Sequence, residues 1–242
     1  LAWSTAYRNR NLIINGAMQV WQRGTSVTAT SGGYSTADRW RHNASGGTLA
    51  LSRQSLTVGQ TDIPSQFKYF FRVNATTGDN NAALQYKVED VTSVPEGKVT
   101  LSFYAKGTNP NGGSVMVYVS QIFGSGGSSE VAVTSPHENI TLTSSWQRFV
   151  ITLDVPSLSG KTVGTNSYFW IIIGQPSGDT STDAWTLDFT GVQLEVGDQA
   201  TPFEHRSYGE ELALCERYLQ RWGISVRYNT TSSNHHATQM FS

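Results

Sequence analysis

The chain has 242 residues, with 17 Lys and Arg against 18 Asp and Glu, which gives a net charge of −1. This balance excludes general attraction to a polyanion such as nucleic acid, because such binding needs a basic face that displaces counterions. Its single cysteine excludes an internal disulfide. Its 14% charged residues and 23 Gly are typical of an all-β protein with many turns.

The first third of the chain alternates short apolar segments with turn signals. Residues 11–14 and 18–22 are predicted to be strands on either side of Asn15-Gly16, a dipeptide favoured in two-residue hairpin turns. Further strands are predicted near residues 38–43, 49–56, 67–74 and 82–91.

Apolar residues in the middle of the chain recur at odd positions. They are Val99, Leu101, Phe103 and Ala105, then Val115, Val117 and Val119, then Phe149, Ile151, Leu153 and Val155. A period of two marks strands with one face in the core. One contiguous sandwich is therefore expected from about Asn11 to Val196, with these odd-numbered side chains inside it.

Two later strands depart from simple alternation. Residues 168–173 are apolar on both faces, which indicates a central strand covered on both sides, or one whose second face binds something. This run is far too short to span a bilayer. In residues 185–196 the apolar positions switch from odd to even at Thr190-Gly191, and one inserted residue would cause that switch, so a β-bulge is predicted there.

One segment near the C-terminus is predicted to be helical. Ser207 and Glu210 form a capping-box pattern, and helix-forming residues continue to Arg221, with Gly223 as the stop. The apolar seam of this helix is Tyr208, Leu212, Cys215, Leu219 and Trp222. Its four-and-three spacing is that of a coiled coil, so the seam either joins three copies of the chain or packs on the flank of its own sandwich. A strand is expected over residues 224–228, followed by a polar tail through His235-His236.

The chain carries no recognisable catalytic or cofactor motif. The glycine-rich segment 124–127 lacks the following Lys and helix of a phosphate loop. Asp179, Asp183 and Asp188 could supply oxygen ligands to calcium, but solvation of a polar loop explains them as well. No catalytic residue, cofactor or metal site is predicted. A glycan-cleaving activity stays open as an alternative, because glycosidase carboxylates can lie far apart in sequence.

Aromatic residues give the strongest binding signal. Sugars present flat C–H faces that pack on aromatic rings, and their hydroxyls need polar neighbours. Tyr104, Tyr118, Tyr168 and Trp170 occupy positions that alternate with the core residues of their strands, and Lys106 and Gln121 could supply polar contacts. The alternative is that these rings pack under a second layer of the same protein or under a partner subunit.

Two distinctive motifs lie at the two ends of the chain. The opening motif covers residues 11–26 with Ala37-Asp-Arg-Trp40, and the closing motif covers residues 189–197 with 200–208 and the helical 210–218. These motifs resemble a family of bacteriophage virion domains found in tail-fibre, appendage and capsid-fibre proteins. Residues 145–149 and the last sandwich strand are also similar to jelly-roll carbohydrate-binding modules. Ala17 stands where related openings often carry an acid that can serve a structural calcium.

The resemblance implies a location on the virion, contacts with other virion proteins and attachment to host polysaccharide. Phage fibres are commonly trimers, so a homotrimer is expected. The predicted fold is an all-β jelly roll of two antiparallel sheets over residues 1–202, followed by the helix and tail of residues 203–242. The predicted function is a non-enzymatic, glycan-binding fibre or appendage module. The alternatives are an architectural spacer or capsid-decorating protein, and a glycan-degrading enzyme of the tailspike kind.

Overall fold

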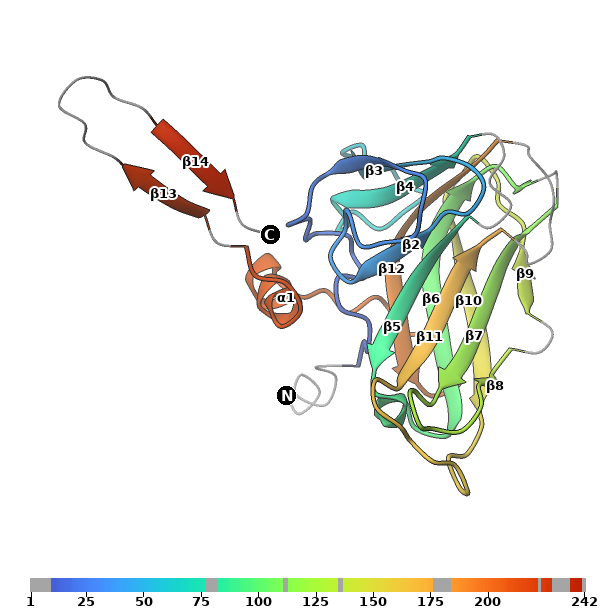
Figure 1. The fold of residues 1–242 in the computed structure, drawn as a ribbon. Coiled ribbons are helices and arrows are strands. Elements are labelled where there is room, and N and C mark those ends of the chain that lie inside the picture. The colour runs from blue at the N-terminus through green and yellow to red at the C-terminus, as the bar shows by residue number, and fades with distance from the viewer. Residues whose placement is uncertain are drawn as a thin grey trace, which may run out of the picture.

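The strands form two antiparallel sheets that face each other (Figure 1). The computed structural model describes residues 10–76, 82–110, 113–134, 137–175 and 184–221, and the backbone of 223–227 and 236–240. Sheet A has the order β1-β3-β4-β12-β6-β10, and sheet B has the order β2-β5-β11-β7-β8, with β9 also paired to β7. This is the predicted jelly-roll class of β-sandwich. The sandwich strands are β1 (Ser26–Ala29), β2 (Trp40–Asn43), β3 (Leu49–Ser55), β4 (Tyr69–Ala75), β5 (Ala83–Glu89), β6 (Gly97–Gly107), β7 (Val115–Ile122), β8 (Val131–Ala132), β9 (Glu138–Ile140), β10 (Gln147–Val155), β11 (Tyr168–Gly174) and β12 (Trp185–Val196), with a short 3-10 helix η1 (Val91–Ser93) after β5.

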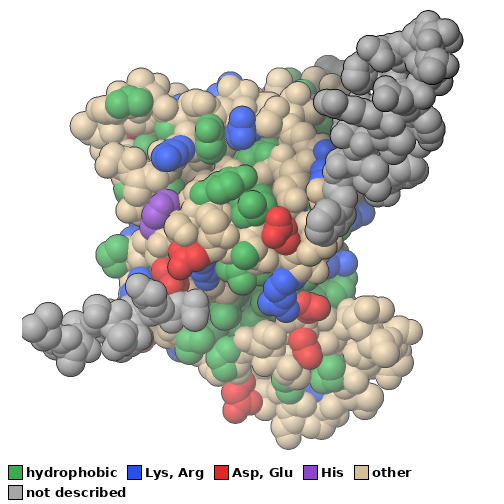
Figure 2. Space-filling view, turned by 90° about the vertical axis from the view of Figure 1, so that its left-hand side faces the viewer, with side chains coloured by type: hydrophobic (Ala, Val, Ile, Leu, Met, Phe, Trp, Pro, Cys, Tyr) green, Lys and Arg blue, Asp and Glu red, His purple; other side chains and the backbone are tan. Residues whose placement is uncertain are grey.

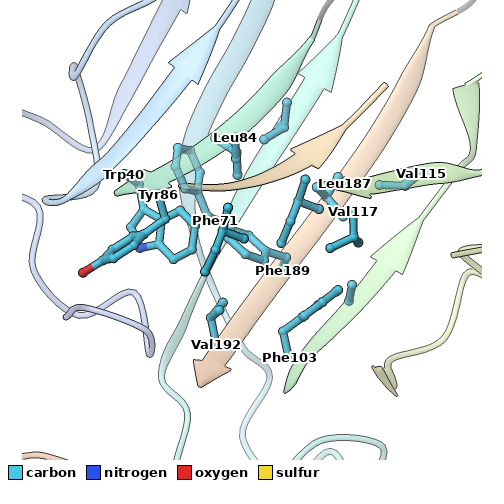
Figure 3. Packing of buried hydrophobic residues seen from close by; sticks show 14 of the residues in the cluster. Trp40, Phe71, Leu84, Tyr86, Phe103, Val115, Val117, Leu187, Phe189 and Val192 are labelled. Carbon is cyan, nitrogen blue, oxygen red and sulfur yellow. The ribbon is translucent and has the colours of Figure 1, made fainter. Parts of the chain in front are cut away.

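The core lies between the two sheets, where their inward side chains interdigitate (Figure 3). Trp40 of β2 meets Phe189 of β12 edge-on, with ring centroids 4.9 Å apart. The predicted odd-numbered core residues are confirmed: Val99, Leu101, Phe103, Ala105, Val115, Val117, Val119, Leu153 and Val155 are buried, and Phe149 and Ile151 pack against the same cluster while half-buried.

The predicted bulge in β12 is confirmed. The register of β12 against β6 shifts between Thr190 and Gln193, and Gly191 takes a φ of 64°. Leu187 before the bulge and Leu194 after it are both buried. The inserted residue therefore lets one strand keep its apolar side chains inward on both sides of the phase switch.

The predicted hairpin around Asn15-Gly16 is wrong, because residues 11–22 form a turn without strands. The Asn15 side chain supplies hydrogen bonds to the backbone that pairing between two strands would otherwise provide. Its Oδ1 accepts hydrogen bonds from the Gln19 and Val20 amides at 2.8 and 2.9 Å, and its Nδ2 donates to the carbonyls of Val20 and Asp38. A buried side chain that satisfies backbone groups in this way competes with regular secondary structure. The strands β1, β8 and β9 were not among the predicted strands.

The opening and closing segments of the sandwich meet and bond to each other. Asn11 Nδ2 donates to the Val192 carbonyl at 3.0 Å, and Asn11 Oδ1 accepts from the Leu194 amide at 3.1 Å. The Asn11 amide donates to Glu204 Oε2 at 2.8 Å, and Arg206 donates to the carbonyls of Asn11 and Ile13. The two sequence motifs at the ends of the chain thus form one hydrogen-bonded unit in the fold.

The helix α1 (Tyr208–Glu216) begins as predicted and ends early. The Ser207 amide donates to Glu210 Oε2 at 2.8 Å, and the Glu210 amide donates to Ser207 Oγ at 3.3 Å, which confirms the capping box. The chain leaves the helix at Arg217, and Tyr218 is then held against the sandwich, with its hydroxyl on Glu89 at 2.5 Å and its ring 3.5 Å from the Arg39 guanidinium. These contacts replace the predicted helical turns up to Arg221.

The predicted oligomer seam needs one correction, because Cys215 is buried against its own chain with 1% exposure. Leu212 and Leu219 are half-buried, Tyr208 is 56% exposed, and Trp222 lies outside the described residues. Figure 2 views the side on which α1 lies in Figure 1, where positive and negative side chains are interspersed. The predicted strand after Gly223 is present as β13 (Gly223–Arg227), and it pairs with β14 (His236–Met240), a strand that was not predicted.

Candidate functional site

A groove of about 670 Å³ crosses the outer face of sheet B. We call it the aromatic groove. It is lined by Arg41 and Asn43 of β2, Ala83, Gln85 and Lys87 of β5, Met116 and Tyr118 of β7, Trp170 and Ile172 of β11, and by His137 and Gln175.

Strand alternation and register place these side chains in rows across the sheet. On β11, Ile172 lies between Gln85 and Tyr118 of the neighbouring strands. Trp170, two residues earlier, is paired with Lys87 on β5. Side chains two residues apart on a strand share a face, so the residues opposite the core on β5, β11 and β7 converge on this one surface.

The floor of the groove is apolar. Ala83, Met116 and Ile172 are buried there, and Tyr118 and Trp170 pack against them while half-buried. Gly174 pairs with Ala83 and Met116 at the end of β11. A Cβ at Gly174 would come within 2.3 Å of the Ala82 carbonyl oxygen, so this close approach of two backbones requires glycine.

Polar and charged groups border the apolar floor. Arg41 Nη1 donates to Gln85 Oε1 at 2.6 Å, which holds the guanidinium across β2 and β5. Lys87 Nζ lies 3.9 Å from the centroid of the Tyr168 ring, and that ring meets Trp170 edge-on at 6.2 Å. These contacts hold Lys87 next to Trp170 and Arg41 next to Gln85 in the neighbouring row.

Tyr118 supplies a hydroxyl at the other side of the groove. It donates to Glu130 Oε1 at 2.8 Å. Burial, followed by the hydrogen bond and charge of Glu130, raises the pKa of Tyr118, so the phenol stays protonated at neutral pH. A flat apolar strip with hydroxyl, amide and cationic groups at its margins can accommodate a ligand with apolar faces and polar edges.

The four predicted aromatic residues do not form one surface. Tyr118 and Trp170 line the groove, and Tyr168 lies beside Trp170 on the same strand without lining it. Tyr104 is on β6 of sheet A, where Phe67 covers it at 5.6 Å in a second cluster with Trp146 and Phe203. The alternative of packing under a second layer therefore applies to Tyr104.

The predicted polar contacts Lys106 and Gln121 lie elsewhere. Lys106 Nζ is 5.2 Å from the Trp146 ring on sheet A, and Gln121 is buried, donating to the Pro156 carbonyl at 3.0 Å. The groove instead uses Arg41, Gln85 and Lys87. Gln85 and Lys87 were not among the predicted site residues, although their alternation with Leu84, Tyr86 and Val88 is a signal that places them opposite the core. Arg41 has no such local signal, because it reaches Gln85 through the pairing of β2 with β5.

The structure also bears on the calcium candidates. Asp188 is committed to two hydrogen bonds with Arg72, each 2.7 Å long, and Asp179 and Asp183 lie outside the described residues. Within the described ranges, no group of three or more His, Cys, Asp or Glu side chains could hold a metal ion. No described helix is long and apolar enough to cross a membrane.

No family model matches the chain, and no curated protein matches it. The fold does have counterparts among solved structures.

Three of these counterparts illustrate the likeness. A putative sugar-binding protein from Bacteroides thetaiotaomicron is 16% identical with a TM-score of 0.45, and the match covers 76% of this chain and 99% of that chain. The enzymatically active domain of tailspike protein 4 of bacteriophage CBA120 is 14% identical with a TM-score of 0.45, over 77% of this chain and 21% of that chain. The CBM22-1 xylan-binding domain from Paenibacillus barcinonensis is 16% identical with a TM-score of 0.39, over 75% and 100% of the two chains. At these identities the likeness concerns the fold, and what this sandwich binds follows from its own residues.

Proposed function

We propose that this domain is a non-enzymatic glycan-binding module, carried on a phage particle as part of a fibre or appendage. The observation that carries the glycan-binding part is the aromatic groove. It combines the apolar strip of Trp170, Ile172 and Tyr118 with the polar groups of Arg41 and Gln85. A pyranose ring needs both, because its C–H face packs on an aromatic ring while its hydroxyls exchange hydrogen bonds at the edges.

The placement on a virion is supported by the sequence motifs at the two ends of the chain. In the fold these motifs bond to each other through Asn11, Glu204 and Arg206. The proposed partners are other virion proteins and host surface polysaccharide.

Trp170 provides the direct test of glycan binding. The purified protein is incubated with host bacterial cells and with polysaccharide stripped from them, and retention is measured. Trp170→Ala should weaken binding by about 0.5–1.5 kcal/mol, or about two- to tenfold, as the loss of one stacked ring does. Tyr69→Ala is the matched control, because Tyr69 is a half-buried ring on β4 of sheet A, outside the groove.

The outcomes separate the proposal from its alternatives. Equal retention of the Trp170→Ala variant and the wild type would refute the groove as the binding site. No retention by wild type, combined with binding to other virion proteins, would favour an architectural spacer. Release of reducing ends from the polysaccharide would establish an enzyme instead.

We further propose that the parent protein is a homotrimer. Of the predicted seam, Tyr208, Leu212 and Leu219 are available for such a contact. Cys215 is not, because it is buried in its own chain. Light scattering of the protein at tens of micromolar measures the state directly. A trimer should dissociate in the double variant Leu212→Asp with Leu219→Asp, with its strand signal in circular dichroism unchanged. A monomeric wild type would refute the contact for this part of the chain.

A further inference from the structure

The charge of the aromatic groove indicates which glycans it takes. Arg41, Lys87 and His137 line the groove, and none of its described lining residues is Asp or Glu. The chain as a whole carries a net charge of −1. The positive charge is therefore a local property of the groove and not a consequence of a basic protein.

The two groove cations form no ion pair with a carboxylate among the described residues, whereas five other basic residues do. Arg23, Arg72, Lys98, Arg206 and Arg217 each lie within 4.0 Å of a carboxylate. Within the described part of the chain, Arg41 and Lys87 form no such ion pair: Arg41 contacts the neutral amide of Gln85, and Lys87 contacts the ring face of Tyr168. Both side chains are half-buried. A partly desolvated cation gains most from an anion that completes its contacts.

The placement of the cations suits a chain-like ligand lying on Trp170 and Ile172. Arg41 is paired with Gln85, and Lys87 is two residues along the same strand on the same face. Such diagonal positions have backbones about 7–8 Å apart, so both cations lie on the same side of the apolar strip, the side of β5 and β2. Two acids lie near this surface. Glu130 accepts a hydrogen bond from Tyr118 on β7, on the other side of β11 from β5, and Glu89, two residues beyond Lys87 on β5, is engaged by Tyr218 and Arg217.

We propose that the aromatic groove selects acidic glycans, with Arg41 and Lys87 pairing with carboxylate groups of uronic acid residues while Trp170 packs on a sugar face. This rests on the glycan-binding function proposed above. A neutral glycan would fill the apolar strip but leave the two cations unpaired.

The test compares each of three acidic polymers, polygalacturonate, alginate and hyaluronan, with the same polymer after its carboxyl groups are reduced to hydroxymethyl groups. Affinity is measured by calorimetry at low salt. Wild type should bind at least one acidic polymer about tenfold or more tightly than its reduced form, as two charge-assisted contacts imply. Added salt should weaken binding to the acidic polymer and leave the neutral polymer unaffected. A sulfated polymer of the same series shows whether the site takes anions in general or carboxylates in particular.

Variants assign the effect to the groove. Arg41→Gln and Lys87→Gln should each lower affinity for the acidic polymer about three- to tenfold and leave affinity for the reduced polymer unchanged. Arg53→Gln is the matched control, because Arg53 is a half-buried arginine on β3 of sheet A without an ion pair within the described ranges. Arg41→Lys, which keeps the charge, should recover part of the affinity, and thermal unfolding confirms that each variant is folded.

The failures of the two proposals are distinguishable. Equal or tighter binding of the reduced polymers, or an equal loss with Arg53→Gln, would overturn the charge selectivity while glycan binding stands. Absence of binding to every polymer, acidic or reduced, together with no retention on cells or stripped polysaccharide, would overturn both.

Discussion

Asp188 on β12 and Arg72 on β4 lie opposite each other in the sheet and share two hydrogen bonds of 2.7 Å, from Arg72 Nε and Nη2 to the two carboxylate oxygens. The Asp188 side chain is 3% exposed and that of Arg72 is 39% exposed. The hydrogen bond to Asp188 raises the pKa of Arg72, so the guanidinium stays charged. This ion pair links β4 and β12, the two central strands of sheet A, on the outer face of that sheet.

Asp188→Asn should therefore lower the free energy of unfolding by about 1–3 kcal/mol, because it removes the charge from a buried bidentate contact. Urea unfolding followed by circular dichroism measures the loss. Asp154→Asn is the control, since Asp154 and its partner Lys98 are both exposed, and such surface pairs contribute about 0–1 kcal/mol. Equal effects of the two substitutions would contradict the importance of the buried pair.

Phe103→Ala tests the packing of the core that lies between the two sheets. The ring is fully buried and lies 5.6 Å from that of Phe149 on the neighbouring strand. Its removal should cost about 3–5 kcal/mol, from lost burial and the cavity left behind. Val150→Ala, at a position 49% exposed on the same strand pair, should change stability by no more than about 0.5 kcal/mol. A small effect at Phe103 would mean that the cluster is loosely packed.

Gly191→Ala tests the bulge in β12. The residue has a φ of 64°, and an added Cβ would lie 2.6 Å from Phe67 Cζ. Backbone strain and the clash together should destabilise the protein by about 1–3 kcal/mol. Gly209→Ala in α1 has nothing within 4 Å of the new Cβ and should be neutral or stabilising by up to about 1 kcal/mol, as a better helix former. The thermal midpoints of the two variants should move in different directions.

Glu211 gives a prediction about pH. Burial raises its pKa, although the Asn15 amide and Arg206 partly oppose this. The folded state then holds more protons than the unfolded state between the two pKa values. Stability from this group is thus fully present below the unfolded pKa and is lost as pH rises through the folded pKa.

Glu211→Gln removes this titration. Stability of wild type and variant is compared by urea unfolding across the acidic to neutral range, and the variant should gain relative to wild type as pH rises. Burial also raises the pKa of Asp38, but that group is present in both proteins and cancels in the difference. A difference that is constant with pH would show that Glu211 has an ordinary pKa in the fold.

Local patterns predicted much of the sandwich because each pattern has a local physical cause. Alternation through β6, β7 and β10 follows from the geometry of a strand, and the phase switch in β12 follows from one inserted residue. The capping box at Ser207 depends on residues three apart. The hairpin prediction at Asn15-Gly16 was wrong because the conformation there does not depend on the dipeptide alone. The Asn15 side chain bonds to Val20 and Asp38, and these contacts set the turn.

The sequence by itself determined which side chains point away from the core, but not which sheet they belong to. Tyr104 and Tyr118 have the same parity in consecutive strands, and the chain sends β6 to sheet A and β7 to sheet B. Tyr104 is consequently covered by Phe67, whereas Tyr118 joins Trp170 in the aromatic groove. Strand pairing also brought Arg41 beside Gln85, across 44 residues of chain. Alternation is a property of one strand, whereas a binding surface is made by the order of strands, and that order is decided by long-range pairing and burial of the shared core.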